Sequence, residues 1–217
     1  MIEVGKGYIA WATDEDIRNS GASGGFVTAL MAAALEKNFV DNVLVVRKEG
    51  VYEGVPELTS EVEVVKEAAG SLHSAPVNLA KYVKRSGKVA MPAKPCDSRA
   101  VIEQAKRNQV NLDEVYLIGL NCGGSMPPVP TRRMVEEVYE LDPESVTGEE
   151  IAKGKLIFNT KDGEKAVKIG ELEDNGYGRR TSCRYCITNI PVMADLACGN
   201  WGVPNEKFGE ATFVQVL

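Results

Sequence analysis

Short apolar runs alternate with helical patterns along most of the chain. Runs rich in Val, Ile and Leu predict strands at 42–47, 51–58, 88–91, 115–120 and 211–217. Apolar residues at helical spacing predict helices at about 26–35, 60–68, 76–85, 98–107 and 131–141. Thr13, with Asp16 three residues later, predicts a capping box for a further short helix. This order is typical of an α/β fold, and we expect a mixed sheet with flanking helices.

The pattern changes in the last third of the chain. Residues 155–160 and 165–169 flank a turn that contains Asp162 and Gly163, which predicts a C-terminal antiparallel hairpin. The sequence has no internal repeat and no low-complexity linker. Residues 1–217 are therefore expected to form a single domain.

Composition narrows the classes of function. The 217 residues are 44% hydrophobic, without an apolar run of the roughly 18 residues that a membrane-spanning helix needs. A formal charge of −6 excludes the strongly basic character typical of nucleic-acid binding. The N-terminus lacks a basic start followed by an apolar stretch, so a cytoplasmic protein is expected. In that reducing compartment the five cysteines indicate metal or redox chemistry rather than disulfides.

The positions of the cysteines carry more information than their number. Cys183 and Cys186 are two residues apart, a spacing at which two thiolates can hold one soft metal centre. Cys96 and Cys122 each follow a predicted strand, where ligands bind in open α/β sheets. Our interpretation is a four-thiolate iron-sulfur site that forms when the chain folds. Cys198 is read as a small buried packing residue.

Other chemistries remain open for the CxxC pair. Zinc accepts thiolates at the same spacing as an iron-sulfur cluster does. A thioredoxin-like dithiol is a third alternative, although it usually lies at a helix start close to the N-terminus.

Two further features are candidates for cofactor contact. Ser23, Gly24 and Gly25 precede the helix at 26–35, and backbone amides at a helix start suit the phosphates of a nucleotide cofactor. The alternative is that Ser23 is an ordinary helix cap and the glycines allow close packing. His73, the only histidine, lies in a predicted loop, where it can contact a flavin or an anionic substrate, or simply pack.

Taken together, these motifs resemble the beta-subunit family of coenzyme F420-reducing hydrogenases and F420-linked formate dehydrogenases, and most of all the formate dehydrogenase subunits of methanogens. The similar segments occur in the family's order and span nearly the whole chain. They are 8–16, 22–28, 67–73, 94–97, 118–122 and 183–186, with Ala194, Asp195, Gly199 and Gly202.

The resemblance implies a flavoprotein that holds FAD and one 4Fe-4S cluster and reduces coenzyme F420. The family's cluster ligands correspond to Cys96, Cys122, Cys183 and Cys186. Its cofactor-binding positions correspond to Ser23, Gly24, Gly25, Thr28, Asn200, Trp201 and Gly202, with His73 and Lys94 as candidates for cofactor phosphates or the anionic coenzyme. Asp97 stands where many members have Gln, and Asn200 where many have another polar or small residue.

The resemblance also implies a partner. The expected role is to pass electrons from a catalytic alpha subunit, most simply of a formate dehydrogenase, through the cluster to FAD and as hydride to F420. Alternatives are a hydrogenase beta subunit, a ferredoxin-fed F420 reductase, or a non-catalytic zinc-binding or electron-relay scaffold. Subunits of the family usually continue past this point, so a truncated or short form is expected.

Overall fold

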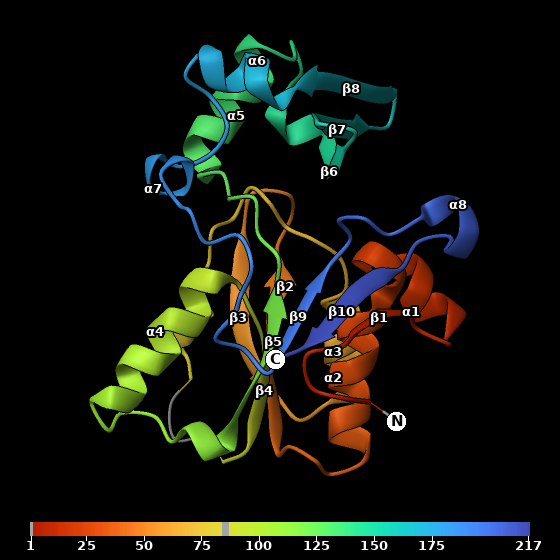
Figure 1. Ribbon diagram of the computed structural model, residues 1–217. Helices are drawn as coiled ribbons and strands as arrows, with labels where there is room; N and C mark the ends of the chain where they lie inside the picture. Colours follow the sequence, from red (N-terminus) through yellow and green to blue (C-terminus); the bar gives the residue numbers. More distant parts are fainter. Residues whose placement is uncertain (1, 84–86) are drawn as a thin grey trace.

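The larger of two sheets forms the body of the molecule. The computed structural model describes residues 2–83 and 87–217. Seven strands are ordered β1-β10-β9-β5-β4-β2-β3 (Figure 1). Pairs among β2, β4, β5 and β9 are parallel, and β1, β3 and β10 run antiparallel to their neighbours, so the predicted mixed sheet is confirmed. The strands are β1 (Gly7–Ala10), β2 (Asn42–Lys48), β3 (Gly54–Thr59), β4 (Val89–Ala93), β5 (Val115–Leu120), β9 (Leu196–Gly199) and β10 (Thr212–Val216).

Helices cover both faces of this sheet. Val43 and Val45 pack on the side of α2 and α3, and Leu44 packs on the side of α4, so β2 is buried on both faces as predicted. No helix in residues 2–83 and 87–217 has the length and apolar character needed to cross a membrane. The helical elements of this body are α1 (Glu15–Ser20), η1 (Ala22–Gly25), α2 (Phe26–Glu36), α3 (Val62–Glu67), η2 (Leu79–Lys81), α4 (Pro95–Lys106), η3 (Leu112–Glu114), α7 (Thr181–Arg184) and α8 (Asn205–Phe208).

Side chains that bind backbone amides account for two wrong predictions. The helix at 76–85 is only the short turn η2 in its described part, because Asn78 and Asp97 accept the amides of Ala80 and Leu79. Residues 84–86 lie outside the described residues. The cap of α1 is Asp14 rather than Thr13, and its Oδ1 accepts the amides of residues 16 and 17.

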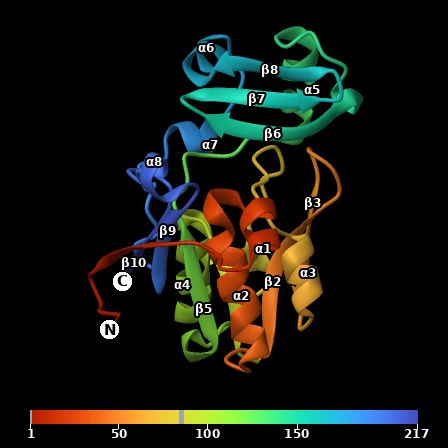
Figure 2. The same ribbon diagram turned by 90° about the vertical axis from the view of Figure 1, so that its right-hand side faces the viewer.

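The smaller sheet has its own core. The predicted hairpin is β7 (Lys155–Thr160) and β8 (Gly163–Lys168), but β6 (Val146–Ala152) adds a third antiparallel strand. The sequence pattern missed β6, β1 and β9, which are either very short or rich in polar residues. Figure 2 shows this sheet above the body together with α5 (Pro128–Glu137) and α6 (Ile169–Asp174), and the short turn η4 (Pro143–Ser145) directly precedes β6. Its core includes Met134, Tyr139, Leu156, Phe158 and Leu172.

A carboxylate ties the small sheet to the body. Glu149 of β6 accepts the amide of His73, the amide of Ser74 at 2.9 Å and the Ser74 hydroxyl. Tyr52, between β2 and β3, packs in the small core, and its hydroxyl donates to the Pro143 carbonyl at 3.3 Å. Ser74 is fully buried, so loss of the carboxylate would leave donors without partners.

We predict that Glu149→Ala loosens this junction. Losing charge-assisted hydrogen bonds at a buried site lowers the free energy of unfolding by about 1–3 kcal/mol. Hydrogen exchange at the amides of His73 and Ser74 should then accelerate about tenfold or more. Glu150→Ala is the matched control, because Glu150 is the next residue of β6 and is exposed. Equal exchange rates in both variants would contradict the assignment of Glu149.

Candidate functional site

The candidate residues gather at one edge of the large sheet. Parallel strands place their carboxyl ends on the same side, and β1 has the same direction as β9 because both are antiparallel to β10. η1 follows β1, Cys96 follows β4, Cys122 follows β5 and Asn200 follows β9. In Figure 1 this edge faces α7 and the small sheet. Strands lie about 4.8 Å apart, so β1 and β5, three positions apart in the sheet, are separated by roughly 14 Å.

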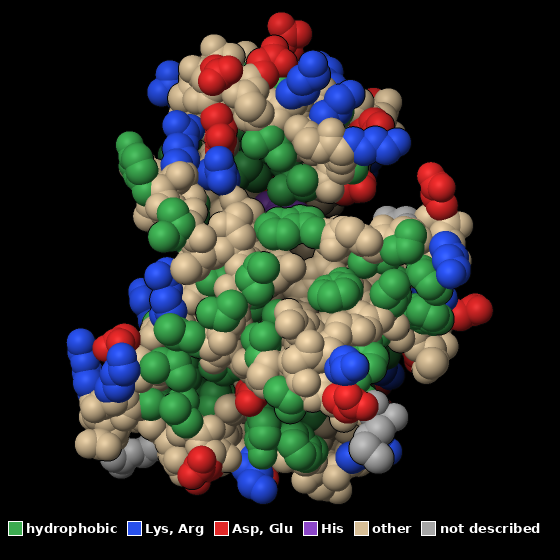
Figure 3. Space-filling view, in the orientation of Figure 1, with side chains coloured by type: hydrophobic (Ala, Val, Ile, Leu, Met, Phe, Trp, Pro, Cys, Tyr) green, Lys and Arg blue, Asp and Glu red, His purple; other side chains and the backbone are tan. Residues whose placement is uncertain are grey.

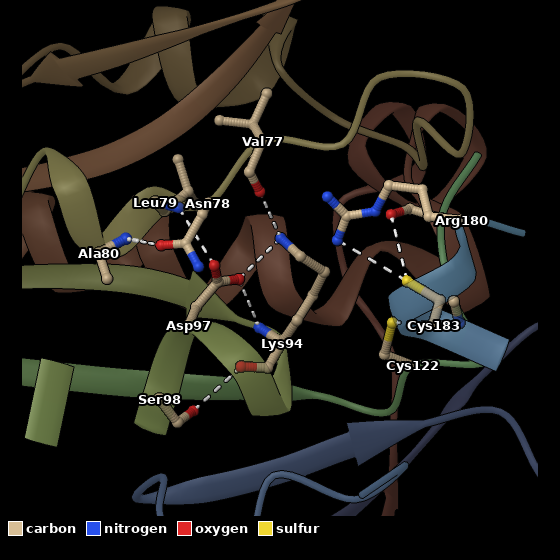
Figure 4. A network of polar contacts seen from close by, with 12 residues as sticks. Val77, Asn78, Leu79, Ala80, Lys94, Asp97, Ser98, Cys122, Arg180 and Cys183 are labelled. Atoms are coloured by element: carbon tan, nitrogen blue, oxygen red, sulfur yellow. Dashed lines mark hydrogen bonds and ion pairs between the residues drawn. The ribbon is translucent and has the colours of Figure 1, made fainter. Parts of the chain in front are cut away.

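The loop after β5 packs closely against the CxxC segment. A Cβ on Gly124 would lie 2.5 Å from Cδ of Arg179 and 3.2 Å from Cβ of Cys183, and the positive φ of this residue also favours glycine. The Arg180 amide donates to the Ser125 carbonyl at 3.0 Å. Figure 4 shows the result, with Cys122 and Cys183 side by side although they are 61 positions apart in the chain.

The environment of the CxxC pair favours thiolates. Burial raises the pKa of Cys183, but hydrogen bonds from the Ser125 backbone and from the Arg180 guanidinium at 3.7 Å outweigh it and lower that pKa. Hydrogen bonds with Thr188 lower the pKa of Cys186, and the positive charge of Arg99 adds to the effect. Thiolate is the form that binds metals.

The two cysteines that follow strands β4 and β5 have raised rather than lowered pKa values. Burial raises the pKa of Cys96, and the neighbouring Asp97 and Cys122 raise it further. Burial also raises the pKa of Cys122, although the Gly124 amide donates to its sulfur at 3.4 Å and opposes the shift. The charge of Cys122 therefore acts on Cys96, and the charge of Cys183 acts on Cys122.

Lys94 and Asp97 form a fixed network beside these thiols. The Lys94 ammonium donates to the Val77 carbonyl at 2.8 Å and pairs with Oδ2 of Asp97 at 2.7 Å (Figure 4). The same Asp97 oxygen accepts the Lys94 amide at 3.0 Å. The positive charge of Lys94 acts on both Cys96 and Cys122, which lowers the pKa of each thiol against the effect of burial.

The donor set fits an iron-sulfur cluster in its chemistry. Four thiols reach one region from three separate segments, and amide or guanidinium donors are directed at the sulfurs of Cys122 and Cys183. In residues 2–83 and 87–217 no three His, Cys, Asp or Glu side chains form a group that could hold a metal ion as they stand. The ligand assignment thus stays a prediction. Cys198 lies buried in β9, and burial raises its pKa to about 12, in agreement with its reading as a packing residue.

The glycine turn has a demanding conformation. Ser23, Gly24 and Gly25 all have positive φ. A Cβ on Gly24 would lie 2.4 Å from the Glu210 carbonyl oxygen, so close packing requires the glycine. At the same time α2 begins without a side-chain cap, which leaves backbone amides available, and Thr28 is buried within its first turn. Ser23 is therefore not the cap of α2, and the prediction of an ordinary serine cap is wrong, whereas close packing of the glycines and phosphate binding by the backbone amides are both compatible with the structure.

His73 lies at the junction of the two sheets rather than between two long helices. Its carbonyl accepts the Met126 amide at 2.8 Å. Burial lowers the pKa of its imidazole, Glu149 opposes that shift, and Lys48 reinforces it. Figure 3 shows a hollow between the small sheet and the body, with hydrophobic atoms along it. The structure thus places the loop of His73 at this hollow.

The turn after β9 begins beside the cysteine loop. The Asn121 amide donates to the Cys198 carbonyl at 2.7 Å, and a Cβ on Gly199 would lie 2.2 Å from Nδ2 of Asn121. Asn200, Trp201 and Gly202 follow directly and are exposed. The turn and the cysteines are therefore neighbours, while the glycine turn of η1 lies further along the same edge.

Two residues of the site were not predicted from the sequence. Ser125 contacts the Cys183 sulfur, and Glu149 holds the loop of His73. The Gly-Gly-Ser run directly after Cys122 was the available signal for a tight loop around the sulfurs. No sequence signal indicated the role of Glu149, because its partner Ser74 is 75 positions away in the chain.

Comparison with known proteins identifies relatives of this chain. Profiles described as coenzyme F420 hydrogenase/dehydrogenase, beta subunit N-term and C terminus, match residues 8–84 and 86–216. F420-dependent formate dehydrogenase 1 subunit beta of Methanococcus maripaludis is 48% identical over 214 residues, which are 96% of this chain and 55% of that protein. The formate dehydrogenase subunit beta of Methanocaldococcus jannaschii is 51% identical over 210 residues, 94% of this chain and 54% of that protein. The chain spans about half the length of these relatives.

Hydrogenase subunits are more distant. Coenzyme F420 hydrogenase subunit beta of Methanosarcina barkeri is 28% identical over 207 residues, 90% of this chain and 70% of that protein. In a solved structure of the F420-reducing [NiFe] hydrogenase complex from Methanosarcina barkeri, one chain superposes with a TM-score of 0.83 and 26% identity, covering 100% of this chain and 78% of that chain. The fold, the profiles and the relatives agree, and the chain belongs to the coenzyme F420 hydrogenase/dehydrogenase beta-subunit family.

Proposed function

We propose that this chain is the F420-reducing subunit of a formate dehydrogenase. In this proposal a single domain of residues 1–217 holds one 4Fe-4S cluster and FAD. Electrons would come from a catalytic alpha subunit in a hetero-oligomer. The observation that carries the proposal is the meeting of Cys96, Cys122 and the CxxC segment at one sheet edge in a member of this family.

The cofactors would supply the redox chemistry, since a cluster transfers single electrons and a flavin collects two and delivers a hydride to F420. The chain's own part is to hold and tune them. Cys96, Cys122, Cys183 and Cys186 would ligate the cluster, and the Gly124 amide and Arg180 would stabilise negative charge on sulfur.

The flavin would lie along the same edge. Backbone amides at the start of α2 suit its phosphates, with Ser23, Gly24, Gly25 and Thr28 forming that end. The turn of Asn200, Trp201 and Gly202 follows β9, which lies between β1 and β5 in the strand order, and this position supports our assignment of the turn to the ring. His73 would approach from the junction with the small sheet. Lys94 is already paired with Asp97, so we assign its charge to the cluster region rather than to a phosphate.

Sequence identity favours formate over hydrogen as the electron source. The relatives named as formate dehydrogenase subunits are 48% and 51% identical, whereas that named as a hydrogenase subunit is 28% identical. A ferredoxin-fed reductase would differ from this proposal in its electron donor. A zinc-binding scaffold would differ in its cofactor content.

The proposal predicts the content of the purified protein. Anaerobically prepared protein should show a flavin spectrum with one FAD and about four irons per chain. With the alpha subunit present it should reduce F420 when formate is the donor. Reduction with hydrogen or reduced ferredoxin, but not formate, would identify a different donor. Zinc without a flavin chromophore would refute the proposal.

Cysteine variants test the ligand assignment. Cys122→Ser and Cys183→Ser should each lose the cluster, so that iron and sulfide fall from about four per chain toward zero. Cys198→Ser is the control and should retain iron and sulfide. The Cys198 thiol is buried in β9, and burial raises its pKa. Comparable loss of iron in all three variants would show that the ligands are wrongly assigned.

A further inference from the structure

A segment of mostly apolar residues begins at the cysteine site and is exposed to solvent. We call residues 185–193 the apolar strip, and they contain no charged side chain. Exposed apolar residues this close together mark a surface that contacts another molecule. The exposed fractions are 81% for Tyr185, 94% for Ile187, 47% for Ile190, 67% for Val192 and 50% for Met193.

The strip has a rigid support. The Asn189 carbonyl accepts the Cys122 amide at 2.9 Å, and Pro191 is buried against β5, where a Cβ on Gly119 would lie 2.4 Å from its Cγ. Figure 1 shows the segment after α7 running down beside β5 and α4. Figure 3 shows hydrophobic side chains gathered on this face. Its outward side chains are therefore presented by the sheet rather than by a loose loop.

Arginines border the end of the strip that is nearest the cysteines. Arg184 donates to the carbonyls of Tyr177 and Arg179, and Arg180 donates to the Cys183 sulfur. The charge of Arg99 acts on Cys186. Within residues 2–83 and 87–217, no carboxylate forms an ion pair with Arg99, Arg180 or Arg184. A local positive border in a chain of net charge −6 favours an acidic partner.

We propose that the apolar strip docks the subunit that delivers electrons to this chain, through an apolar patch of that partner bordered by carboxylates. This inference rests on the proposed function. An apolar centre with arginine at its edge is typical of protein interfaces. The strip includes Cys186, the one exposed thiol of the four candidates, so a partner seated there covers it. In a symmetric dimer the strip would meet a second copy of itself, which contains no carboxylate to pair with the arginine border, and this disfavours a second copy as the occupant.

The test compares two valines in the complex with the formate dehydrogenase alpha subunit. Val192→Asp places a carboxylate in the strip and should raise the Kd for the alpha subunit about tenfold or more. Formate-driven reduction of F420 at limiting alpha subunit should fall with it, while dithionite-driven reduction stays unchanged. Val4→Asp is the control, since Val4 is similarly exposed and precedes β1, three strands from β5.

Arg99→Glu should slow association with the alpha subunit and reduce the dependence of the association rate on salt.

Three results would overturn the assignment of this surface. They are an unchanged Kd for Val192→Asp, equal weakening by Val4→Asp, and loss of self-association in Val192→Asp while binding to the alpha subunit persists. The last result would make the strip an interface between copies of the chain. Failure of the proposed function gives a different result, because the wild-type protein would then lack dithionite-driven reduction of F420.

Discussion

The buried carboxylate of Asp97 is the interaction on which the cysteine site depends. It has no exposed surface, and it accepts the Leu79 amide at 3.1 Å and the Lys94 amide at 3.0 Å while pairing with the Lys94 ammonium. A buried carboxylate is tolerated only when it is paired and hydrogen-bonded, and here its partners are Lys94, just before α4, and the Leu79 amide of η2. The carboxylate therefore fixes the start of α4, where Cys96 lies.

Strand direction then decides which segments meet. Because β4, β5 and β9 are parallel, the loops that follow them share one edge, and the reversal through β10 brings β1 and the glycine turn to the same edge. The small sheet lies over that edge, held by Glu149 and by Tyr52. The candidate cofactor-binding residues, the junction of the two sheets and the exposed strip are consequently neighbours.

Electrostatics divides the four candidate thiols into two pairs. Cys183 and Cys186 have hydrogen-bond donors and arginines near them and lowered pKa values, whereas burial raises the pKa of Cys96 and Cys122. Binding a metal centre requires all four as thiolates, so assembly would release protons chiefly from the buried pair. The positive charge of Lys94 offsets part of that cost, which gives a structural reason for a lysine at this position.

The sequence by itself determined the α/β class, the buried strand β5 to its residue bounds, the hairpin of β7 and β8, and the two strand ends that carry cysteines. Those features depend on local periodicity and turn chemistry, which are readable in short windows. It did not determine β1, β6 or β9, the turn η2 in place of a helix, or the roles of Asp97 and Glu149. Only the tertiary structure decided these, because each depends on a partner distant in the chain, as β9 does on β5 and Glu149 on the loop of His73. Pairing across such separations leaves no local pattern, whereas a buried strand or a glycine turn does.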